Sequence, residues 1–308
     1  MVVPRREGPV DLVLMENDVV RALVAPGIGG RVVSLVHRPS GREFLWRNRE
    51  LELERCAPGS EYDPNFYGGM DELLPCDIPE TIDGIEYPDH GELWTLPLDH
   101  EITGERLLMA GRLPRSGLTY ERTVRLEGNR LIGDYSIGNP TDEARVFLWK
   151  LHGALAVRPG DRVVCPAATA RVADPEWSRR KSTESFAWPV AEGLDLSVVP
   201  QADGTTDFLY LSDLSEGRMA LHATDGARIE CEFDLAVFPC AWYFASHGGL
   251  DGAVTAILEP CTTMPISVNE AARDGVCARL DPGDRIETTM SWSIDVAVGG
   301  TSRVGGTS

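Results

Sequence analysis

The sequence lacks the motifs of several cofactor- and metal-dependent classes of enzyme. No GxGxxG motif follows an expected strand and strands do not alternate with helices, which disfavours a dinucleotide-binding fold. The HExxH and DxDxDG patterns are missing, so a metal site is not indicated. GxSxG is also missing and no serine has a candidate base beside it, which argues against a serine hydrolase.

Positive charge is scarce as well. Lys and Arg together number 29 against 48 Asp and Glu, which gives a net charge of −19. The backbone of a nucleic acid or an anionic membrane surface would repel such a protein, so we expect neither as a partner. The acidity itself is best explained by solubility.

Long apolar runs and paired cysteines are missing too. No stretch approaches the ~18 consecutive apolar residues of a membrane span, and the N-terminus has no apolar run of signal-peptide length. The seven cysteines are odd in number and have no CxxC spacing, which fits a reducing compartment. These absences together predict a cytoplasmic protein.

The sequence does contain a recurring alternation of apolar and polar residues. In residues 286–296 the apolar side chains share one face, and Glu, Thr, Ser and Asp share the other. Residues 228–237 alternate in the same way, with Cys231 as a small buried side chain. Residues 120–126 and a run resuming at Leu131 flank a Glu-Gly-Asn turn, which predicts a hairpin. Such patterns are typical of strands with one buried face.

Turns rich in Gly and Pro separate these segments, whereas helical patterns are weak and the best helix candidate is residues 43–55. Many short antiparallel strands with such turns predict an all-β fold, a large antiparallel β-sandwich with few short helices. A single sandwich can run to ~250 residues or more, and no linker divides this chain. We therefore expect one domain over residues 1–298 and a disordered, small and polar tail over 299–308.

Two of the six histidines stand in segments that suit a reactive site. His90 lies in a loop with turn residues before it and an aromatic residue after it, and loops often carry reactive groups. If residues 146–152 form a strand, Lys150 and His152 share a face that is otherwise apolar, as in the wall of a polar cleft. The competing interpretations are a loop-capping hydrogen bond for His90 and a hydrogen-bonded core histidine for His152.

Acidic and aromatic residues supply further candidates. Glu259 ends an apolar run, where desolvation would make its carboxylate a stronger base; the alternative is a strand-end acid that faces water. Asp71 and Glu72 lie side by side in a glycine-rich bend and could bind sugar hydroxyls or a metal. Trp242, in a Trp-Tyr-Phe cluster, could stack on a sugar ring or pack in the core.

Several of these segments resemble motifs of the aldose 1-epimerase (galactose mutarotase-like) superfamily, and the resemblance covers most of the chain. The matching segments, in chain order, are residues 17–20, 26–32, 69–75, 88–94, 149–152, 242–244, 258–260 and 280–284. Each segment alone is a weak match, but together they occur in the right order. The resemblance implies an elongated antiparallel β-sandwich, the galactose mutarotase-like supersandwich, with a sugar in a concave cleft.

The resemblance also implies a role for three residues. Glu259 would be the general base that removes the proton of the C1 hydroxyl, and His152 the general acid that protonates the ring oxygen. His90 would hydrogen-bond the sugar near the reacting atoms. Ring opening, rotation about C1–C2 and closure from the other face give the opposite anomer. This chemistry needs no metal or cofactor; a small-molecule sugar is the implied partner, and the protein is expected to be a monomer or homodimer.

The sequence departs from the best-known galactose mutarotases. It has no Asn-Arg segment before the first histidine, and Asp213 is only a candidate for the aspartate that grips the distal sugar hydroxyls. Asp71 and Glu72 instead resemble a more divergent branch with varied substrates. The acidity disfavours a phosphorylated sugar, although a local arginine such as Arg31 could override it. The candidate substrate-binding residues are Asp71, Glu72, Lys150, Asp213, Trp242 and Arg31.

Other functions remain open beside the mutarotase, an isomerase acting on a free hexose or related reducing sugar. A non-catalytic carbohydrate-binding protein would need the aromatic residues and the cleft, but not both Glu259 and His152. Another carbohydrate-active enzyme of this fold could act on a modified sugar. A polysaccharide lyase is disfavoured, since neither a helical domain nor a basic cleft is indicated. A purely structural sandwich would not need histidines and acids clustered in turns.

Overall fold

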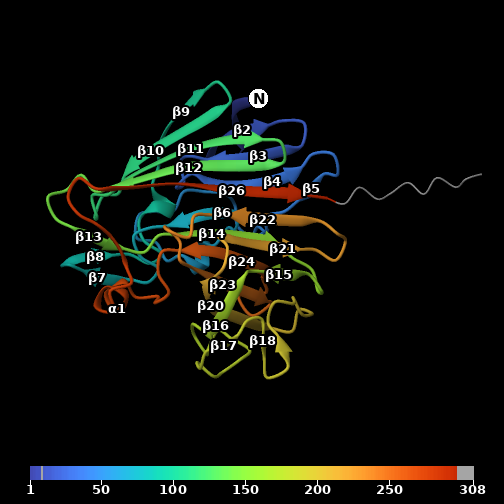
Figure 1. Ribbon diagram of the computed structural model, residues 1–308. Helices are drawn as coiled ribbons and strands as arrows, with labels where there is room; N and C mark the ends of the chain where they lie inside the picture. Colours follow the sequence, from blue (N-terminus) through green and yellow to red (C-terminus); the bar gives the residue numbers. More distant parts are fainter. Residues whose placement is uncertain (8–9, 297–308) are drawn as a thin grey trace, which may run out of the picture.

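The computed structural model describes residues 1–7 and 10–296; the expected tail, residues 299–308, lies outside the described residues. Two large antiparallel sheets make up most of the molecule (Figure 1). The larger sheet has twelve strands, in the spatial order β1 (Val2–Glu7), β2 (Val10–Glu16), β3 (Val20–Ala25), β4 (Arg31–His37), β6 (Met70–Leu73), β14 (Lys150–Ala156), β24 (Val254–Cys261), β23 (Cys240–His247), β20 (Thr205–Leu214), β16 (Ala167–Val172) and β17 (Phe186–Ala187), with β5 (Arg42–Glu43) beside β4.

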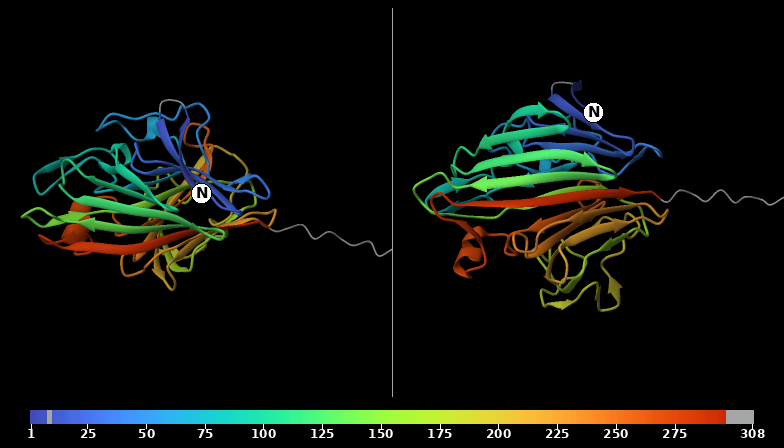
Figure 2. Two further views of the ribbon diagram at one scale, coloured as in Figure 1. Left: turned by 90° about the horizontal axis from the view of Figure 1, so that it is seen from above. Right: turned by 45° about the horizontal axis from the view of Figure 1, so that its top comes forward.

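The smaller sheet has eight strands, in the order β15 (Arg162–Val164), β21 (Arg218–His222), β22 (Arg228–Glu232), β26 (Arg285–Asp295), β12 (Arg130–Gly138), β11 (Thr119–Glu127), β10 (Arg106–Arg112) and β9 (Asp99–Thr103). The strands β10, β11, β12 and β26 lie side by side as one layer in Figure 2. The remaining elements are the pairs β13 (Arg145–Phe147) with β25 (Ala278–Leu280), β18 (Val190–Ala191) with β19 (Leu194–Asp195) and β7 (Glu80–Ile82) with β8 (Ile85–Tyr87), the 3-10 turns η1 (Asp63–Asn65) and η2 (Leu93–Thr95), and helix α1 (Val268–Arg273).

The main hydrophobic core lies between the two sheets. Met290, Trp292 and Ile294 of β26 are buried there, as the alternation in residues 286–296 predicts. Leu151 and Leu155 of β14 meet them from the larger sheet. Each large side chain fully buried in such a core stabilises the fold by about 1.5–3 kcal/mol. The all-β sandwich is therefore confirmed, and so is the hairpin of β11 and β12, whose strands join through Gly128 and Asn129.

The helix predicted for residues 43–55 is wrong, because backbone pairing overrides local helical propensity there. Leu45 forms a β-bridge with Leu155, and the amide of Trp46 donates to the carbonyl of Ala154 at 2.9 Å. The segment therefore runs extended beside β14, and no residue of 43–55 is helical. Helix propensities differ by less than about 1 kcal/mol for ordinary residues, so tertiary hydrogen bonds decide the conformation.

Two other strand predictions need new limits. The alternating segment 228–237 is a strand only as far as Glu232, since the chain turns at Asp234 and Val237 donates its amide back to the Asp234 carbonyl. The expected strand 146–152 is divided into β13 and β14, and Leu148 and Trp149 lie between them. Among the residues that the structure describes, no helix is long and apolar enough to cross a membrane.

Candidate active site

A cavity of about 280 Å³ lies on the outer face of the larger sheet. Gly153 identifies the inner face, since a Cβ there would meet the Trp292 ring of the smaller sheet at 2.8 Å. Neighbouring residues of a strand point to opposite faces, so Lys150 and His152 point outward, where they line the cavity. Small-molecule pockets begin at about 300 Å³, so the cavity suits a ligand of roughly one sugar ring.

The register of the larger sheet sets three of the predicted residues in one row. β6 and β14 pair with Asp71 opposite His152. β14 and β24 pair in a register that sets Glu259 opposite His152, one position from the Gly153–Leu258 pair. Directly opposed residues of antiparallel strands share a face, with Cβ atoms about 4.5–5.5 Å apart. Glu259 and His152 therefore meet on the floor of the cavity, each contributed by a different strand.

Asp71 organises the end of the row beside His152. The Nδ1–H of His152 donates to Oδ1 of Asp71 at 3.1 Å, which leaves Nε2 for a ligand. The Tyr62 hydroxyl and the Arg31 guanidinium donate to Oδ2 at 2.8 and 2.6 Å. Burial alone would raise the pKa of Asp71, but the Arg31 charge and the hydrogen bonds from His152 and Tyr62 lower it to about 2. Burial and the nearby Asp71 raise the pKa of Tyr62, so its phenol remains a donor.

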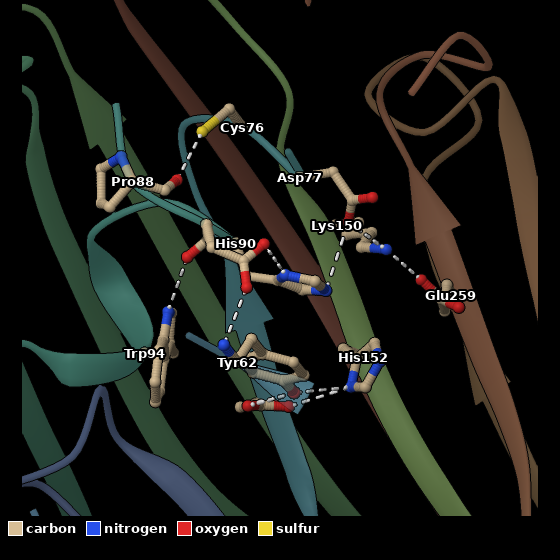
Figure 3. A network of polar contacts seen from close by, with 11 residues as sticks. Tyr62, Cys76, Asp77, Pro88, His90, Trp94, Lys150, His152 and Glu259 are labelled. Atoms are coloured by element: carbon tan, nitrogen blue, oxygen red, sulfur yellow. Dashed lines mark hydrogen bonds and ion pairs between the residues drawn. The ribbon is translucent and has the colours of Figure 1, made fainter. Parts of the chain in front are cut away.

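Lys150 joins Glu259 to a second carboxylate (Figure 3). Its Nζ lies 2.5 Å from Oε2 of Glu259 and 2.6 Å from Oδ1 of Asp77, and all three side chains are at least nine-tenths buried. Burial would lower the pKa of Lys150, but the two carboxylates outweigh it and raise it. Burial would raise the pKa of Asp77, and the Lys150 charge lowers it instead. The ammonium also lies 4.3 Å from the centre of the Trp242 ring, a cation–π contact.

His90 forms the wall of the cavity opposite the sheet. Its ring stacks on Tyr62 with centroids 4.0 Å apart and planes 8° from parallel, and Nδ1 hydrogen-bonds Oδ1 of Asp89 at 2.8 Å. The backbone φ of His90 is +57°, a left-handed conformation that L-residues rarely adopt. Burial disfavours the charged ring, but Asp77 and the hydrogen bond to Asp89 outweigh it and raise the pKa of His90. The strained loop thus holds the His90 ring beside the cavity, next to carboxylates that favour its protonated form.

Aromatic and aliphatic side chains complete the lining. Phe208, Phe244 and Ile257 come from β20, β23 and β24, in the row next to that of Glu259. Phe66 and Trp177 come from loops. Phe66 packs edge-on against His152 with centroids 5.4 Å apart. The cavity therefore combines polar groups on one side with flat apolar surface on the other, as sugar rings with apolar faces require.

Besides Asp71, four predicted substrate-binding residues do not line the cavity. Glu72 points inward, opposite to its neighbour Asp71, and accepts a hydrogen bond from Trp149 Nε1 at 3.1 Å between the sheets. Trp242 is fully buried beside Glu259 on the same face of the sheet, where it donates to the backbone carbonyl of Thr263. Asp213 is exposed at the end of β20 and is not among the lining residues. Arg31 is buried and holds Asp71, so it reaches the cavity only through that carboxylate.

Three residues that contact His152, Lys150 and His90 were not predicted. Tyr62, Asp77 and Asp89 lie in loops, and no local pattern marks them apart from the position of Asp89 next to His90. Their contacts arise only when the loops fold over the sheet. Among the described residues, no three His, Cys, Asp or Glu side chains come close enough together to hold a metal ion.

Comparisons with known proteins define the fold. The chain matches the Slr1438 protein from Synechocystis sp. PCC 6803 with a TM-score of 0.72 at 18% identity, covering 95% of this chain and 97% of that one. Galactose mutarotase-like proteins from Clostridium acetobutylicum and Lactobacillus casei match with TM-scores of 0.71 and 0.67 at 17% and 16% identity. These two alignments cover 96% and 92% of this chain, and 98% and 100% of the others. The chain therefore has the galactose mutarotase-like fold, as the resemblance of its motifs implied.

Sequence comparison is less informative than structure here. A family model described as a domain of unknown function (DUF5107) matches residues 5–76, which run from β1 to just beyond β6. No curated protein matches the chain.

Proposed function

We propose that the protein is an aldose 1-epimerase-like isomerase that interconverts the α and β anomers of a free reducing sugar. The observation that carries this proposal is the pairing of Glu259 with His152 across neighbouring strands, on the floor of a ring-sized cavity. Mutarotation needs a base at the C1 hydroxyl and an acid at the ring oxygen. The two groups must therefore lie no farther apart than the width of one sugar ring. A carboxylate opposite an imidazole meets that requirement.

In the proposed reaction Glu259 accepts the proton of the C1 hydroxyl while the bond between C1 and the ring oxygen breaks. The imidazolium of His152 gives its Nε2 proton to the ring oxygen, and its Nδ1–H stays on Asp71 throughout. The open-chain aldehyde rotates about C1–C2, and the reverse proton transfers close the ring on the other face. Both side chains return to their starting states, so the reaction consumes nothing.

Lys150 and His90 support these steps. The ammonium of Lys150 compensates the negative charge of the buried Glu259 carboxylate. This ion pair lowers the free-energy cost of burying the base in the fold. His90 is placed to donate a hydrogen bond to a sugar oxygen, and that bond would stabilise the negative charge that develops there. We propose a small-molecule sugar as the partner and the cytoplasm as the site of action.

The Lys150–Glu259 ion pair favours one alternative, a carbohydrate-binding protein without turnover. The carboxylate of Glu259 is already bound by the ammonium of Lys150, so a sugar hydroxyl has to compete with that contact. In that case Lys150 and Glu259 would serve as hydrogen-bond partners for sugar hydroxyls. The two functions differ in one measurable quantity, the rate of anomer exchange.

The test is polarimetry of freshly dissolved aldoses in the presence of the protein. We expect acceleration over the buffer rate for at least one sugar and a loss of about 10²–10⁴-fold in Glu259→Gln and in His152→Gln. Glu287→Gln, on the exposed face of β26, is the matched control and should retain full activity. Binding of a sugar without acceleration would support the binding protein and contradict the isomerase.

A further inference from the structure

A second hollow adjoins the candidate sugar cavity. It is an open groove of about 820 Å³, lined by residues of β3 and β4, by residues 45–50 and by the loop 250–254. Asp63, Phe66 and Leu250 line both the groove and the cavity. These three side chains form the boundary between the groove and the cavity.

An aromatic side chain stands in the groove next to the shared wall. Trp46 is half-buried and lines the groove, and its ring stacks on Phe66 with centroids 5.3 Å apart and planes 26° from parallel. Its amide is bonded to β14, and Gly68 passes so close that a Cβ would lie 2.7 Å from the indole. The indole is thus fixed in orientation before any ligand binds, which lowers the entropic cost of binding to it.

The charges of the two spaces indicate an uncharged ligand. The cavity is lined by five carboxylates, which belong to Asp63, Asp77, Asp89, Asp174 and Glu259. The basic side chains facing them are one lysine, already paired twice, and two histidines. The groove carries three arginines, Arg21, Arg47 and Arg49, against four acids, Glu43, Glu50, Asp63 and Asp251. Arg31, the arginine that the sequence offered for a phosphate, is bound to Asp71.

We infer that the substrate is a neutral reducing oligosaccharide, with its reducing-end unit in the cavity and the next unit in the groove beside Trp46. This inference rests on the proposed function for the reaction at the reducing end, and it adds the substrate class. A single sugar ring fills a space of the size of the cavity and leaves the groove empty. A β-linked or α-linked second unit would pass Phe66 and Leu250 and place its apolar face against the indole.

The test compares kcat/KM for anomer exchange, measured by NMR, between glucose or galactose and the disaccharides cellobiose, maltose and lactose. We expect at least one disaccharide to exceed its monosaccharide by about tenfold, the ratio that one good stacking contact supplies. In Trp46→Leu the ratio of disaccharide to monosaccharide kcat/KM should fall to about twofold or less. Trp188→Ala, which removes a half-buried tryptophan outside both spaces, is the control and should keep the preference.

The outcomes separate this inference from the proposed function. Exchange of monosaccharides with no gain for any disaccharide would overturn the inference and leave the isomerase standing. Calorimetric binding that favours disaccharides in the wild type and loses this preference in Trp46→Leu, without any exchange, would support the groove and contradict the isomerase. Tighter binding of glucose 6-phosphate or glucuronate than of any neutral sugar would overturn the inference, and so would the absence of binding to the whole panel.

Discussion

The substitution Asp71→Asn tests the electrostatic design of the site. It keeps the shape of the side chain but removes the charge that binds Arg31 at 2.6 Å and orients His152. The pKa of Asp71 falls from 3.8 to about 2 in the fold, and each unit corresponds to about 1.4 kcal/mol, so the charge contributes about 2.5 kcal/mol. The variant also leaves the buried Arg31 without its carboxylate, and breaking such a pair costs about 3–5 kcal/mol. We therefore expect a loss of at least about 2.5 kcal/mol at pH 7.

The pH dependence of that loss follows from the direction of the shift. A carboxyl group whose pKa is lowered by folding stabilises the protein above its unfolded pKa, and the contribution is lost as the pH falls through the folded pKa. For Asp71 this window runs from 3.8 down to about 2. The difference between wild type and Asp71→Asn should therefore be constant from pH 5 to pH 8 and shrink below pH 4.

Urea unfolding followed by circular dichroism measures both quantities. Asp213→Asn is the matched control, because Asp213 is exposed with φ +56° and Asn tolerates that conformation well. The control should change the free energy of unfolding by no more than about 0.5 kcal/mol. A loss below about 1 kcal/mol for Asp71→Asn at pH 7, or a loss that is the same at pH 3 as at pH 7, would refute the reasoning.

Two further predictions concern the cations of the site. Lys150→Met leaves the carboxylates of Asp77 and Glu259 facing each other without a cation. It should lower the free energy of unfolding by about 3 kcal/mol or more at pH 8. The loss should be smaller at pH 5, where a proton can replace the ammonium. Unfolding at both pH values measures this, and Lys181→Met is the control, since the sequence has only these two lysines and Lys181 is exposed. His90 has a raised pKa, so its interaction with Asp77 stabilises the fold below pH 6.5 and is lost as the pH rises through the folded value. The Tm difference between wild type and His90→Asn should be larger at pH 6 than at pH 9; an equal difference at both would contradict the assignment.

Much of the fold could be predicted because strand periodicity is a local signal. The alternation in residues 286–296 marks β26, and the Gly-Asn turn marks the β11–β12 hairpin. The helix prediction for residues 43–55 was wrong because a distant strand determines the backbone conformation there. Residues 45 and 46 hydrogen-bond to β14, more than 100 positions away. No local pattern carries that information.

Part of the site could be predicted because the order of the motifs along the chain matches that of a known superfamily. That order indicates which residues meet in the fold, although they are far apart in the sequence. Glu259 and His152 are 107 positions apart, and only the register of β14 with β24 sets them opposite each other. Glu72 was misplaced because residues 70–73 were interpreted as a bend, whereas in a strand its side chain must point opposite to that of Asp71. Tyr62 and Asp77 could not be found, because their partners are reached through loops whose paths the sequence does not specify.

The central claim is that Glu259 and His152 exchange protons with the two oxygens at C1 of a sugar. The most direct measurement is NMR exchange spectroscopy between the two anomeric protons of a neutral sugar at equilibrium, with wild type and Glu259→Gln at equal concentration. Cross-peaks that grow with wild-type protein and fall to the buffer level in a folded Glu259→Gln variant are the predicted result. Equal exchange rates with wild type, variant and buffer for every sugar that binds would contradict the account.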